Sequence, residues 1–244
     1  MVEVSVSLYQ VEDRGSLEEN VSAVVECIKR AESDFLCVPE FFAHPLGFLR
    51  ELTERFGRKA AEKAYEKTWW VIDEVRNASR KFDGCLIAGT VIERDGENYY
   101  NTCYVFKGGE VVEKYRKINI IEEEVKAGIT PGSETVSFVH KNVVTGVMVC
   151  ADCLSDEVVD SSCRKAKLVF LPISMTSPDH PSVEGHPLSL KAARKYGVVI
   201  AKTSRTAIYK GRKFGVKSAV ITPQGVLVEA DGVDEQVVSA VLDF

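Results

Sequence analysis

The sequence predicts one α/β domain built around a mixed β-sheet. Short apolar runs rich in β-branched residues alternate with segments of helical periodicity, as in domains where strands alternate with helices. Between residues 85 and 121, three strand-like runs are separated only by turn residues, which indicates an antiparallel meander. Because the 244-residue chain shows no repeat, low-complexity segment or linker, we expect a single domain spanning 1–244.

The first half of the chain begins with a strand and a helix. Apolar and polar residues alternate over 2–9, which predicts a strand with one buried face, and Ser16 with Glu19 forms a capping box that opens a helix. A second buried strand, 34–38, places Glu40 at its carboxyl end, where open α/β sheets bind ligands. The other elements expected in this half are a helix over 49–82, intact or broken near Gly57, and strands at 85–93, 99–107 and 110–121.

The second half of the chain contains a buried strand that stops abruptly at a cysteine. The β-branched run 143–149 predicts this strand, and Cys150 follows it where the pattern becomes helical. The other elements expected here are a strand at 135–140, a helix at 153–166, a strand at 167–173, a loop rich in Ser, Pro, Gly and His at 174–187, a helix at 189–196, and strands near 197–203, 216–222, 226–230 and 236–243.

Composition excludes several kinds of partner. The net charge is -5, and the Lys and Arg residues are scattered rather than gathered in a stripe, which argues against nucleic acid. No apolar segment approaches the roughly 18 to 20 residues of a membrane span. Glu3 also interrupts the start before a signal-peptide core could form. We therefore expect a cytoplasmic protein that does not bind membranes.

The cysteines are expected to be reduced thiols rather than disulfides. Their number is odd, and most lie in apolar runs of a chain without an export signal. Cys150 and Cys153 form a CxxC, which also allows a redox pair or part of a zinc site, although no second motif supplies the remaining zinc ligands. We expect Cys153 to pack on the first helical turn. The seven cysteines are Cys27, Cys37, Cys85, Cys103, Cys150, Cys153 and Cys163.

Three polar residues at or next to strand ends suggest nucleophilic catalysis. Cys150 lies beside the backbone N–H groups of a helix start, which favour a thiolate and can receive an oxyanion. Glu40, among Pro39, Phe41 and Phe42, would have its pKa raised by desolvation and could act as the base. Lys117 could stabilise the charge of the transition state. Taken singly, Glu40 would be part of a solvated turn, Cys150 a buried structural thiol and Lys117 an exposed strand lysine.

These motifs, in this order, resemble the nitrilase superfamily of carbon–nitrogen hydrolases, which have a Glu-Lys-Cys triad. The resemblance rests on Pro-Glu at Glu40, Tyr-Arg-Lys at Lys117 and Gly-x-x-x-Cys-x-Asp at Cys150, and it extends over nearly the whole chain. The supporting matches are Asn101-Thr102, Pro131-Gly132, Glu157, the strand Leu168-Val169-Phe170-Leu171-Pro172, and Gly215-Val216-Lys217-Ser218.

The resemblance implies a fold and a mechanism. The fold would be a four-layer α-β-β-α sandwich of two mixed sheets that pairs into a homodimer. Glu40 would deprotonate Cys150, and Lys117 with the N–H of Ala151 would hold the oxyanion of a thioester-forming reaction. A further carboxylate is placed on Glu124, the third of three consecutive glutamates. No metal or organic cofactor is implied.

The pocket and the substrate follow from the same resemblance. We expect an amidase that converts a small linear amide to the acid and ammonia. The alternatives are a nitrilase, an N-carbamoyl amide hydrolase, and a catalytically silent member that serves as a binding or assembly module. Cys153-Leu154-Ser155-Asp156 replaces the residues that usually follow the nucleophile, and Asp152 is expected to cap the helix or fix the backbone there. Phe41, Phe42 and Met175 are expected to wall the pocket, with the core as the alternative for the aromatic residues. His44, His180 and His186 are expected either at the surface or in the pocket.

Overall fold

Alternation of side chains along the strands builds two β-sheets that pack face to face. The computed structural model describes residues 2–174, 185–209 and 211–244. In β1 (Glu3–Glu12), Val4, Val6 and Leu8 point into a core shared with Leu168 and Phe170 of β9 (Leu168–Ile173) in the opposite sheet. Period-two burial therefore defines the inner face of each sheet, as the sequence pattern predicts.

The first sheet contains the N-terminal strands and the meander. β1, β2 (Phe35–Cys37) and β3 (Cys85–Ile87) are parallel, and the remaining strands pair antiparallel. Its order is β14-β1-β2-β3-β5, with β4 and β6 also paired to β5. These remaining strands are β4 (Val91–Asp95), β5 (Asn98–Lys107), β6 (Glu110–Arg116) and β14 (Gln236–Asp243).

The second sheet is built from the strands between residues 137 and 229. β8 (Val143–Val147), β9 and β10 (Val199–Tyr209) are parallel, with β7 and β12 antiparallel on either side. The two sheets join at one corner, where the end of β1 pairs with β10 through Val11 and Arg205. The remaining strands are β7 (Ser137–His140), β11 (Arg212–Gly215), β12 (Ala219–Thr222) and β13 (Gly225–Glu229).

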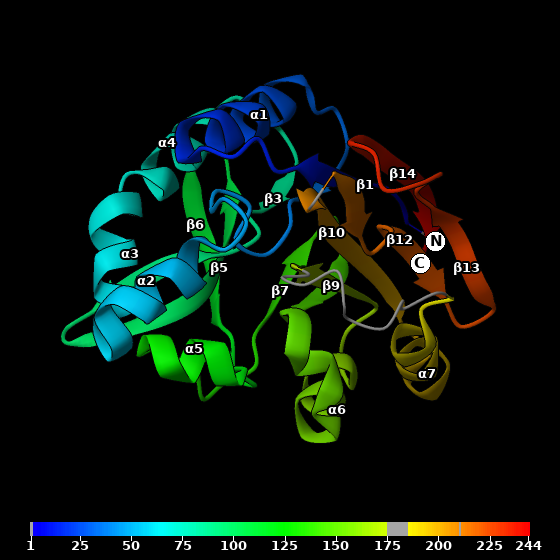
Figure 1. Cartoon of the computed structure of the whole chain (residues 1–244). Helices are drawn as coiled ribbons and strands as arrows, with labels where there is room; N and C mark the ends of the chain where they lie inside the picture. The colour runs from blue at the N-terminus through cyan, green and yellow to red at the C-terminus, as the bar shows by residue number, and fades with distance from the viewer. Residues whose placement is uncertain (1, 175–184, 210) are drawn as a thin grey trace.

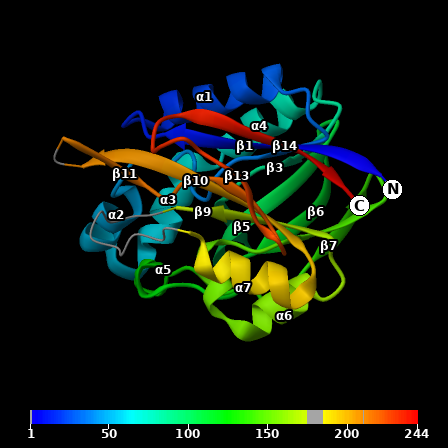
Figure 2. The ribbon, with the colours of Figure 1, turned by 90° about the vertical axis from the view of Figure 1, so that its right-hand side faces the viewer.

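Helices cover the outer faces of both sheets. Figure 2 shows α1 (Leu17–Arg30) and α4 (Val71–Ser79) on one side, the two sheets between, and α6 (Asp156–Cys163) and α7 (Pro187–Tyr196) on the other side. Two separate apolar clusters attach these helix pairs to their sheets. The structure is thus the expected four-layer α-β-β-α sandwich of mixed sheets.

A third group of helices closes one end of the sandwich, at the left of Figure 1. Their apolar residues pack with Ile92 and Ile129 in a cluster of their own. The helices of this group are α2 (Phe48–Phe56), η1 (Gly57–Lys59), α3 (Ala60–Thr68) and α5 (Glu122–Ala127). The last helical element, η2 (Cys150–Leu154), is a short 3-10 turn between β8 and α6.

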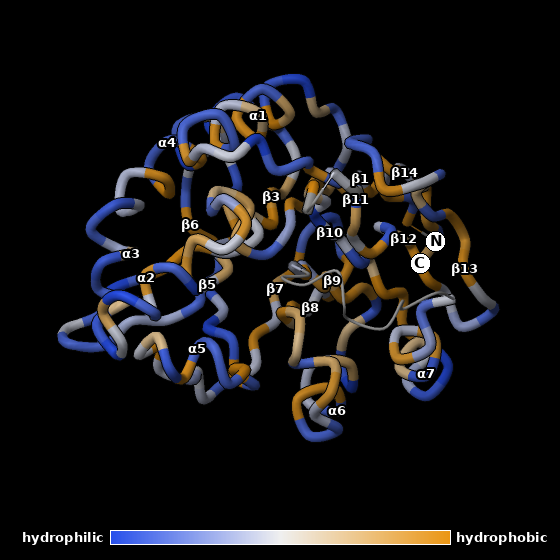
Figure 3. The backbone as a smooth tube through the Cα atoms, in the orientation of Figure 1, coloured by the Kyte–Doolittle hydropathy of each residue, from blue (hydrophilic) through white to orange (hydrophobic). Residues whose placement is uncertain are grey.

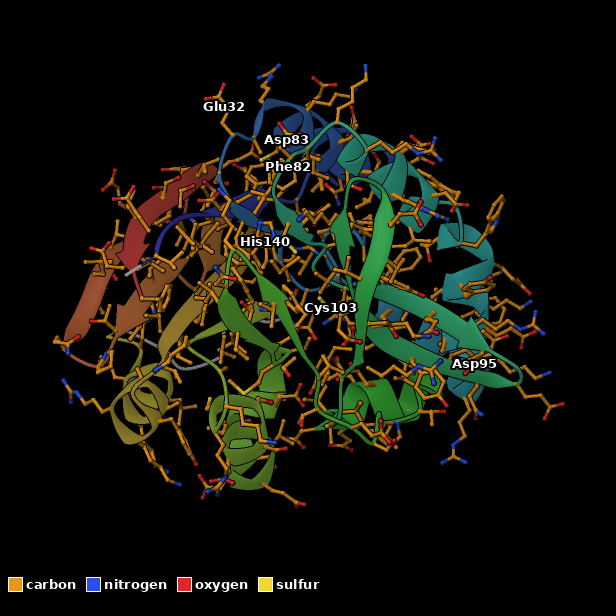
Figure 4. All side chains as sticks on the ribbon, turned by 180° about the vertical axis from the view of Figure 1, so that it is seen from behind. Glu32, Phe82, Asp83, Asp95, Cys103 and His140 are labelled. Carbon is orange, nitrogen blue, oxygen red and sulfur yellow. The ribbon has the colours of Figure 1, made fainter. Side chains whose placement is uncertain are left out.

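The core lies between the sheets and contains several thiols. Figure 3 shows apolar strands in the interior and helices with mixed polar and apolar faces. Cys37, Cys85 and Cys103 belong to the central cluster, and none of the seven cysteines is paired in a disulfide in the structure. Cys103 lies inside the molecule in Figure 4, whereas Glu32 and Asp95 project at its edge.

Several element boundaries differ from the sequence-based expectation. The segment 49–82 is broken at Gly57, one of the two alternatives expected, and also at Trp69, which is 56% exposed. The predicted strand 110–121 ends at Arg116 because the chain turns there into α5, whose short length gives little periodic signal. The predicted strand 85–93 is split into β3 and β4 around Gly89.

In the part of the chain that the structure describes, no helix is both long enough and apolar enough to cross a membrane.

Candidate active site

Glu40, Lys117 and Cys150 line one cavity. Glu40 lies in the turn that follows β2, Lys117 comes directly after β6, and Cys150 begins η2. β2 and β6 belong to the first sheet, whereas the strand before η2 belongs to the second. The sandwich therefore brings together strand ends from both sheets, which explains why three residues so far apart in sequence share one site.

A buried network of ion pairs and hydrogen bonds forms the floor of the cavity. Lys117 Nζ donates to Glu40 Oε1 at 2.9 Å and to Glu124 Oε2 at 2.7 Å. Asn101 Nδ2 also donates to both carboxylates, to Glu40 Oε1 at 2.9 Å and to Glu124 Oε1 at 2.7 Å. All four side chains are buried. One ammonium and one neutral amide thus hold two carboxylates in place.

Glu124 is the member of the Glu122–Glu124 run that enters this network. It is 2% exposed, and its Oε2 also accepts from the N–H of Ile121 at the start of α5. Glu122 is exposed and pairs with Lys126, and Glu123 is exposed at the rim of the cavity. The first turn of α5 therefore selects one carboxylate of the three for the site.

Two glycines let backbone pack closely behind the glutamate and the lysine. Gly132 N donates to Lys117 O at 2.8 Å, and a Cβ added at Gly132 would lie 2.1 Å from Arg116 O. A Cβ added at Gly89, where φ is +52°, would lie 1.9 Å from Pro39 O. Any larger residue would displace the backbone next to the site, so both positions require glycine.

Cys150 is held in an unusual backbone conformation. Its φ is +46°, in the left-handed region that a residue with a side chain rarely occupies. Asp152 holds this turn in place with three hydrogen bonds. Its Oδ2 accepts from Val149 N at 2.8 Å and from Tyr115 Oη at 2.6 Å, and its Oδ1 accepts from Asn119 N at 2.7 Å. Asp152 thus fixes the elbow backbone, one of the two structural roles expected for it.

Ala151 occupies the second position of η2, where the backbone N–H has no partner within the helix. Its carbonyl oxygen accepts from Asn119 Nδ2 at 2.6 Å, which anchors the peptide that follows. The N–H of Ala151 lies one residue beyond the thiol. It remains our proposed second donor to an oxyanion.

Replacing Asp152 tests the locked elbow. Asp152→Ala should lower the free energy of unfolding by about 2 kcal/mol or more, because it leaves the N–H groups of Val149 and Asn119 without their partner. We also expect slower alkylation of Cys150. Tyr115→Phe is the matched control, since it removes one hydrogen bond of the same carboxylate and should cost only about 1 kcal/mol. Urea denaturation and iodoacetamide labelling measure both effects, and an Asp152→Ala protein as stable and reactive as the parent would contradict this role.

The electrostatics favour a protonated thiol beside a basic carboxylate. Burial, and then the charge of Glu40, raise the pKa of Cys150 well above its ordinary value, although Lys117 opposes them. Burial also raises the pKa of Glu40. Burial acts to lower the pKa of Lys117, but the charges of Glu40, Cys150 and Glu124 outweigh it and raise that pKa. Cys150 therefore rests as a thiol, and not as the thiolate that its helix-start position suggested.

The walls of the cavity are mainly apolar. The cavity measures about 80 Å³, and Phe41 and His44 line it as expected, together with Phe48 of α2. The His44 ring stacks on Phe41, with centroids 4.9 Å apart, and packs at 4.7 Å against Phe48. Burial, and then Arg205, lower the pKa of His44 to about 3, so its ring is neutral near neutral pH. The site therefore offers an apolar enclosure for a small molecule.

Phe42 and His186, two other expected pocket residues, are not in the cavity wall. Phe42 is fully buried in the apolar cluster under α1 and α4, because its side chain points to the opposite side of the turn. His186 precedes α7 and contacts Glu229 at 3.1 Å instead. Met175 and His180 lie outside the described residues.

Three contacts at the site had not been anticipated from the sequence. Arg205 Nη1 donates to Phe41 O at 2.7 Å and to His44 O at 2.6 Å, which ties the cavity wall to β10. Ser174 N donates to Glu40 Oε2 at 3.0 Å. Asn101 appeared only as part of a motif. The available signal was a charged or amide side chain inside an otherwise apolar strand, where an unpaired polar group would be costly.

Comparison with known proteins gives one family model and several relatives. The family model described as carbon-nitrogen hydrolase matches residues 5–244. The omega-amidase NIT3 of Saccharomyces cerevisiae is 23% identical over 242 residues, covering 92% of this chain and 81% of that protein. The 2-oxoglutaramate amidase of Bacillus subtilis is 24% identical over 239 residues, covering 94% and 86%.

Solved structures share the fold. A cysteine-to-alanine mutant of a Nesterenkonia AN1 amidase from the nitrilase superfamily superimposes with a TM-score of 0.81 at 20% identity, covering 99% of this chain and 91% of that one. Another structure of that amidase, described as showing covalent addition of the acetamide moiety of fluoroacetamide at the active site cysteine, has a TM-score of 0.79 at 20% identity and covers 99% and 90%. Nit3 of Saccharomyces cerevisiae has a TM-score of 0.78 at 22% identity, with 99% and 90% covered.

Proposed function

The chain belongs to the carbon-nitrogen hydrolase family of the nitrilase superfamily, and we propose that it hydrolyses a small linear amide to the acid and ammonia through a thioester on Cys150. One observation carries the proposal. A buried glutamate and a buried lysine lie in contact at the floor of the cavity that Cys150 also lines. Burying charges in this way is costly for stability, and chemistry that uses them explains why they are kept.

In the proposed acylation step, the thiol of Cys150 gives its proton to Glu40 as its sulfur bonds to the amide carbon. The amide oxygen becomes an oxyanion, which Lys117 and the N–H of Ala151 stabilise. Collapse of this intermediate breaks the C–N bond, and the nitrogen leaves as ammonia after taking the proton from Glu40. The product on the enzyme is a thioester.

In the proposed deacylation step, Glu40 takes a proton from water, whose oxygen attacks the thioester carbon. A second oxyanion forms at the same place and is held by the same donors. Its collapse breaks the C–S bond, releases the carboxylic acid and returns the proton to Cys150. Lys117 uses two of its three N–H bonds on Glu40 and Glu124, which leaves one that can point to the oxyanion.

A nitrilase and an N-carbamoyl amide hydrolase remain the alternatives, because both would use the same three residues. The amidase relatives favour the amide. A silent family member is the alternative outside enzymes. The protonated thiol beside a carboxylate of raised pKa argues against it, since this pairing prepares proton transfer. Pairing of two chains and a cytoplasmic location stay predictions.

A substrate panel tests the proposal. The protein is incubated with linear amides of increasing length, the matching nitriles and the matching N-carbamoyl amines, and ammonia release is followed. Intact mass spectrometry after mixing with fluoroacetamide should reveal one covalent adduct, and peptide mapping should place it on Cys150. We expect turnover of amides in preference to nitriles. No turnover of any compound, with a Cys150 that reacts no faster than the other thiols, would refute the hydrolase.

A further inference from the structure

We propose that Asn101 is a positioning residue that directs one oxygen of Glu40, Oε2, to act as the base toward Cys150. The inference rests on the proposed role of Glu40, but it concerns a residue with no role assigned so far. It rests on the hydrogen bonds to the carboxylates of Glu40 and Glu124 at the cavity floor. These bonds are distributed unequally between the two oxygens of Glu40.

The two oxygens of Glu40 have different surroundings. Oε1 accepts two hydrogen bonds, from Lys117 Nζ and from Asn101 Nδ2, both at 2.9 Å. Oε2 accepts one bond among the described residues, from Ser174 N at 3.0 Å. A carboxylate oxygen has two lone pairs in its plane. Oε1 is therefore saturated, whereas Oε2 keeps a lone pair that can take a proton.

Oε2 is also the oxygen that the backbone of Ser174 connects to the nucleophile. The backbone of Ser174 contacts both groups: its N–H donates to Glu40 Oε2, and its carbonyl oxygen lies 3.9 Å from Cys150 Sγ. Oε1, in contrast, faces Asn101 and Lys117 on the side of Glu124. Saturating Oε1 therefore leaves the free lone pair on the oxygen that Ser174 connects to the thiol.

The Asn101 amide bridges two negative groups. Its nitrogen has two hydrogens. It donates one to Glu40 and the other to Glu124, the latter at 2.7 Å. A hydrogen bond to a carboxylate favours its ionised form, so the bond from Asn101 opposes the rise that burial and the charge of Glu124 cause in the pKa of Glu40. The amide does this as a neutral group, without placing a second positive charge beside Glu40.

The oxygen of the same amide shows that packing alone does not explain the residue. Asn101 Oδ1 is buried and has no hydrogen-bond partner among the described residues. Rotating the amide by half a turn would bring this oxygen against two carboxylates, so the orientation is set by the N–H groups. An apolar residue in the middle of β5 would avoid the unpaired oxygen. The two hydrogen bonds that the N–H groups donate to Glu40 and Glu124 explain an asparagine at this position.

The test measures how the alkylation of Cys150 depends on pH. Iodoacetamide labels the thiol without needing turnover, and its rate should fall at acid pH as Glu40 takes up a proton. The variant Asn101→Leu keeps the size of the side chain but removes both donors. Hydrogen bonds to a carboxylate favour its ionised form, so their loss raises the pKa of Glu40. The acid limb of the profile, where the labelling rate falls as Glu40 takes up a proton, should move up by about one pH unit. Below this limb, labelling of the variant should be about tenfold slower than labelling of the parent.

Two further variants make the outcome decisive. Asn101→Ser retains a hydroxyl that can donate to only one carboxylate, so it should move the acid limb by less, and it serves if the leucine variant folds poorly. Asn98→Leu makes the same change at the exposed start of β5 and should leave the profile unchanged. Profiles for both Asn101 variants that superimpose on the parent would overturn the inference, even if those variants were less stable. A shifted profile in a protein that hydrolyses no amide would instead refute the proposed function while supporting the role of Asn101.

Discussion

Cys150→Ala should abolish amide hydrolysis, lowering kcat/KM by at least about 1,000-fold, because no other group can form the thioester. The variant should also lose the covalent adduct with fluoroacetamide. Its stability should be close to that of the parent, since Cys150 as a residue is partly exposed at the cavity and its thiol donates no short hydrogen bond among the described residues. Ammonia release, intact mass and thermal unfolding measure the three effects.

Cys153→Ser is the matched control for this experiment. Cys153 also lies in η2, but it lines a different recess, with Met148 and Leu171. Burial raises the pKa of its thiol, as it does for Cys150, but Cys153 does not line the cavity that contains Glu40 and Lys117. We expect the serine variant to keep most of its activity and to form the adduct. Equal losses from both substitutions would favour the redox interpretation of the CxxC and count against the thioester mechanism.

The strands and helices, and the places of the three candidate residues at or next to strand ends, could be predicted because they depend on local patterns, whereas the four-layer arrangement was predicted from the family resemblance. Each core strand is a short apolar run, and the end of a strand can be read from the first polar or turn residue after it. Glu40 and Cys150 follow such runs directly. The order of the three motifs, more than any one of them, indicated the family, since a single Pro-Glu or a single buried cysteine is common in proteins of any function.

The rest of the site depends on long-range contacts that no local pattern contains. Asn101 reaches both carboxylates only because β5 places it beside two other elements, and Arg205 meets Phe41 only where β10 joins β1. α5 was missed because six residues with three glutamates have no clear amphipathic period. Glu124 was chosen among the three glutamates on family resemblance, and its role in catalysis stays a prediction. The structure places it against Lys117 through the first turn of α5.

The unusual sequence after the nucleophile now has a structural interpretation. We expected Cys153-Leu154-Ser155-Asp156 to be where this protein differs from its relatives. Ser155 begins α6, and its side chain accepts from Val158 N, so it is a helix cap. Leu154 is 66% exposed and lies away from the cavity. These residues shape the outer surface beside α6 and not the cavity wall, which is formed by the segment after Glu40.

Lys117→Met should be the most damaging single change for folding and activity together. The ammonium is 1% exposed and is the cation that contacts both Glu40 and Glu124. Removing it leaves two buried carboxylates uncompensated, which should lower the free energy of unfolding by about 3–5 kcal/mol. Loss of the oxyanion donor should lower kcat/KM by at least about 100-fold. Lys114→Met is the matched control: Lys114 is 39% exposed, and losing its pair with Glu93 should cost less than about 1 kcal/mol.

The pH dependence of the Lys117→Met defect separates lost charge from lost packing. Burial already raises the pKa of Glu40 above the ordinary value of 4.5, and Lys117 is the main group opposing that rise. Without Lys117 the pKa of Glu40 in the folded state rises further, so the folded protein holds a proton that the unfolded chain releases. A carboxyl group of this kind stabilises the fold fully below its unfolded pKa, and that contribution is lost as the pH rises through the folded pKa. Urea denaturation should therefore show a deficit against the parent that is small near pH 4.5 and grows toward neutral pH. A deficit of the same size at both would mean that Lys117 acts through the packing of its carbon chain, and that its charge does not compensate the carboxylates.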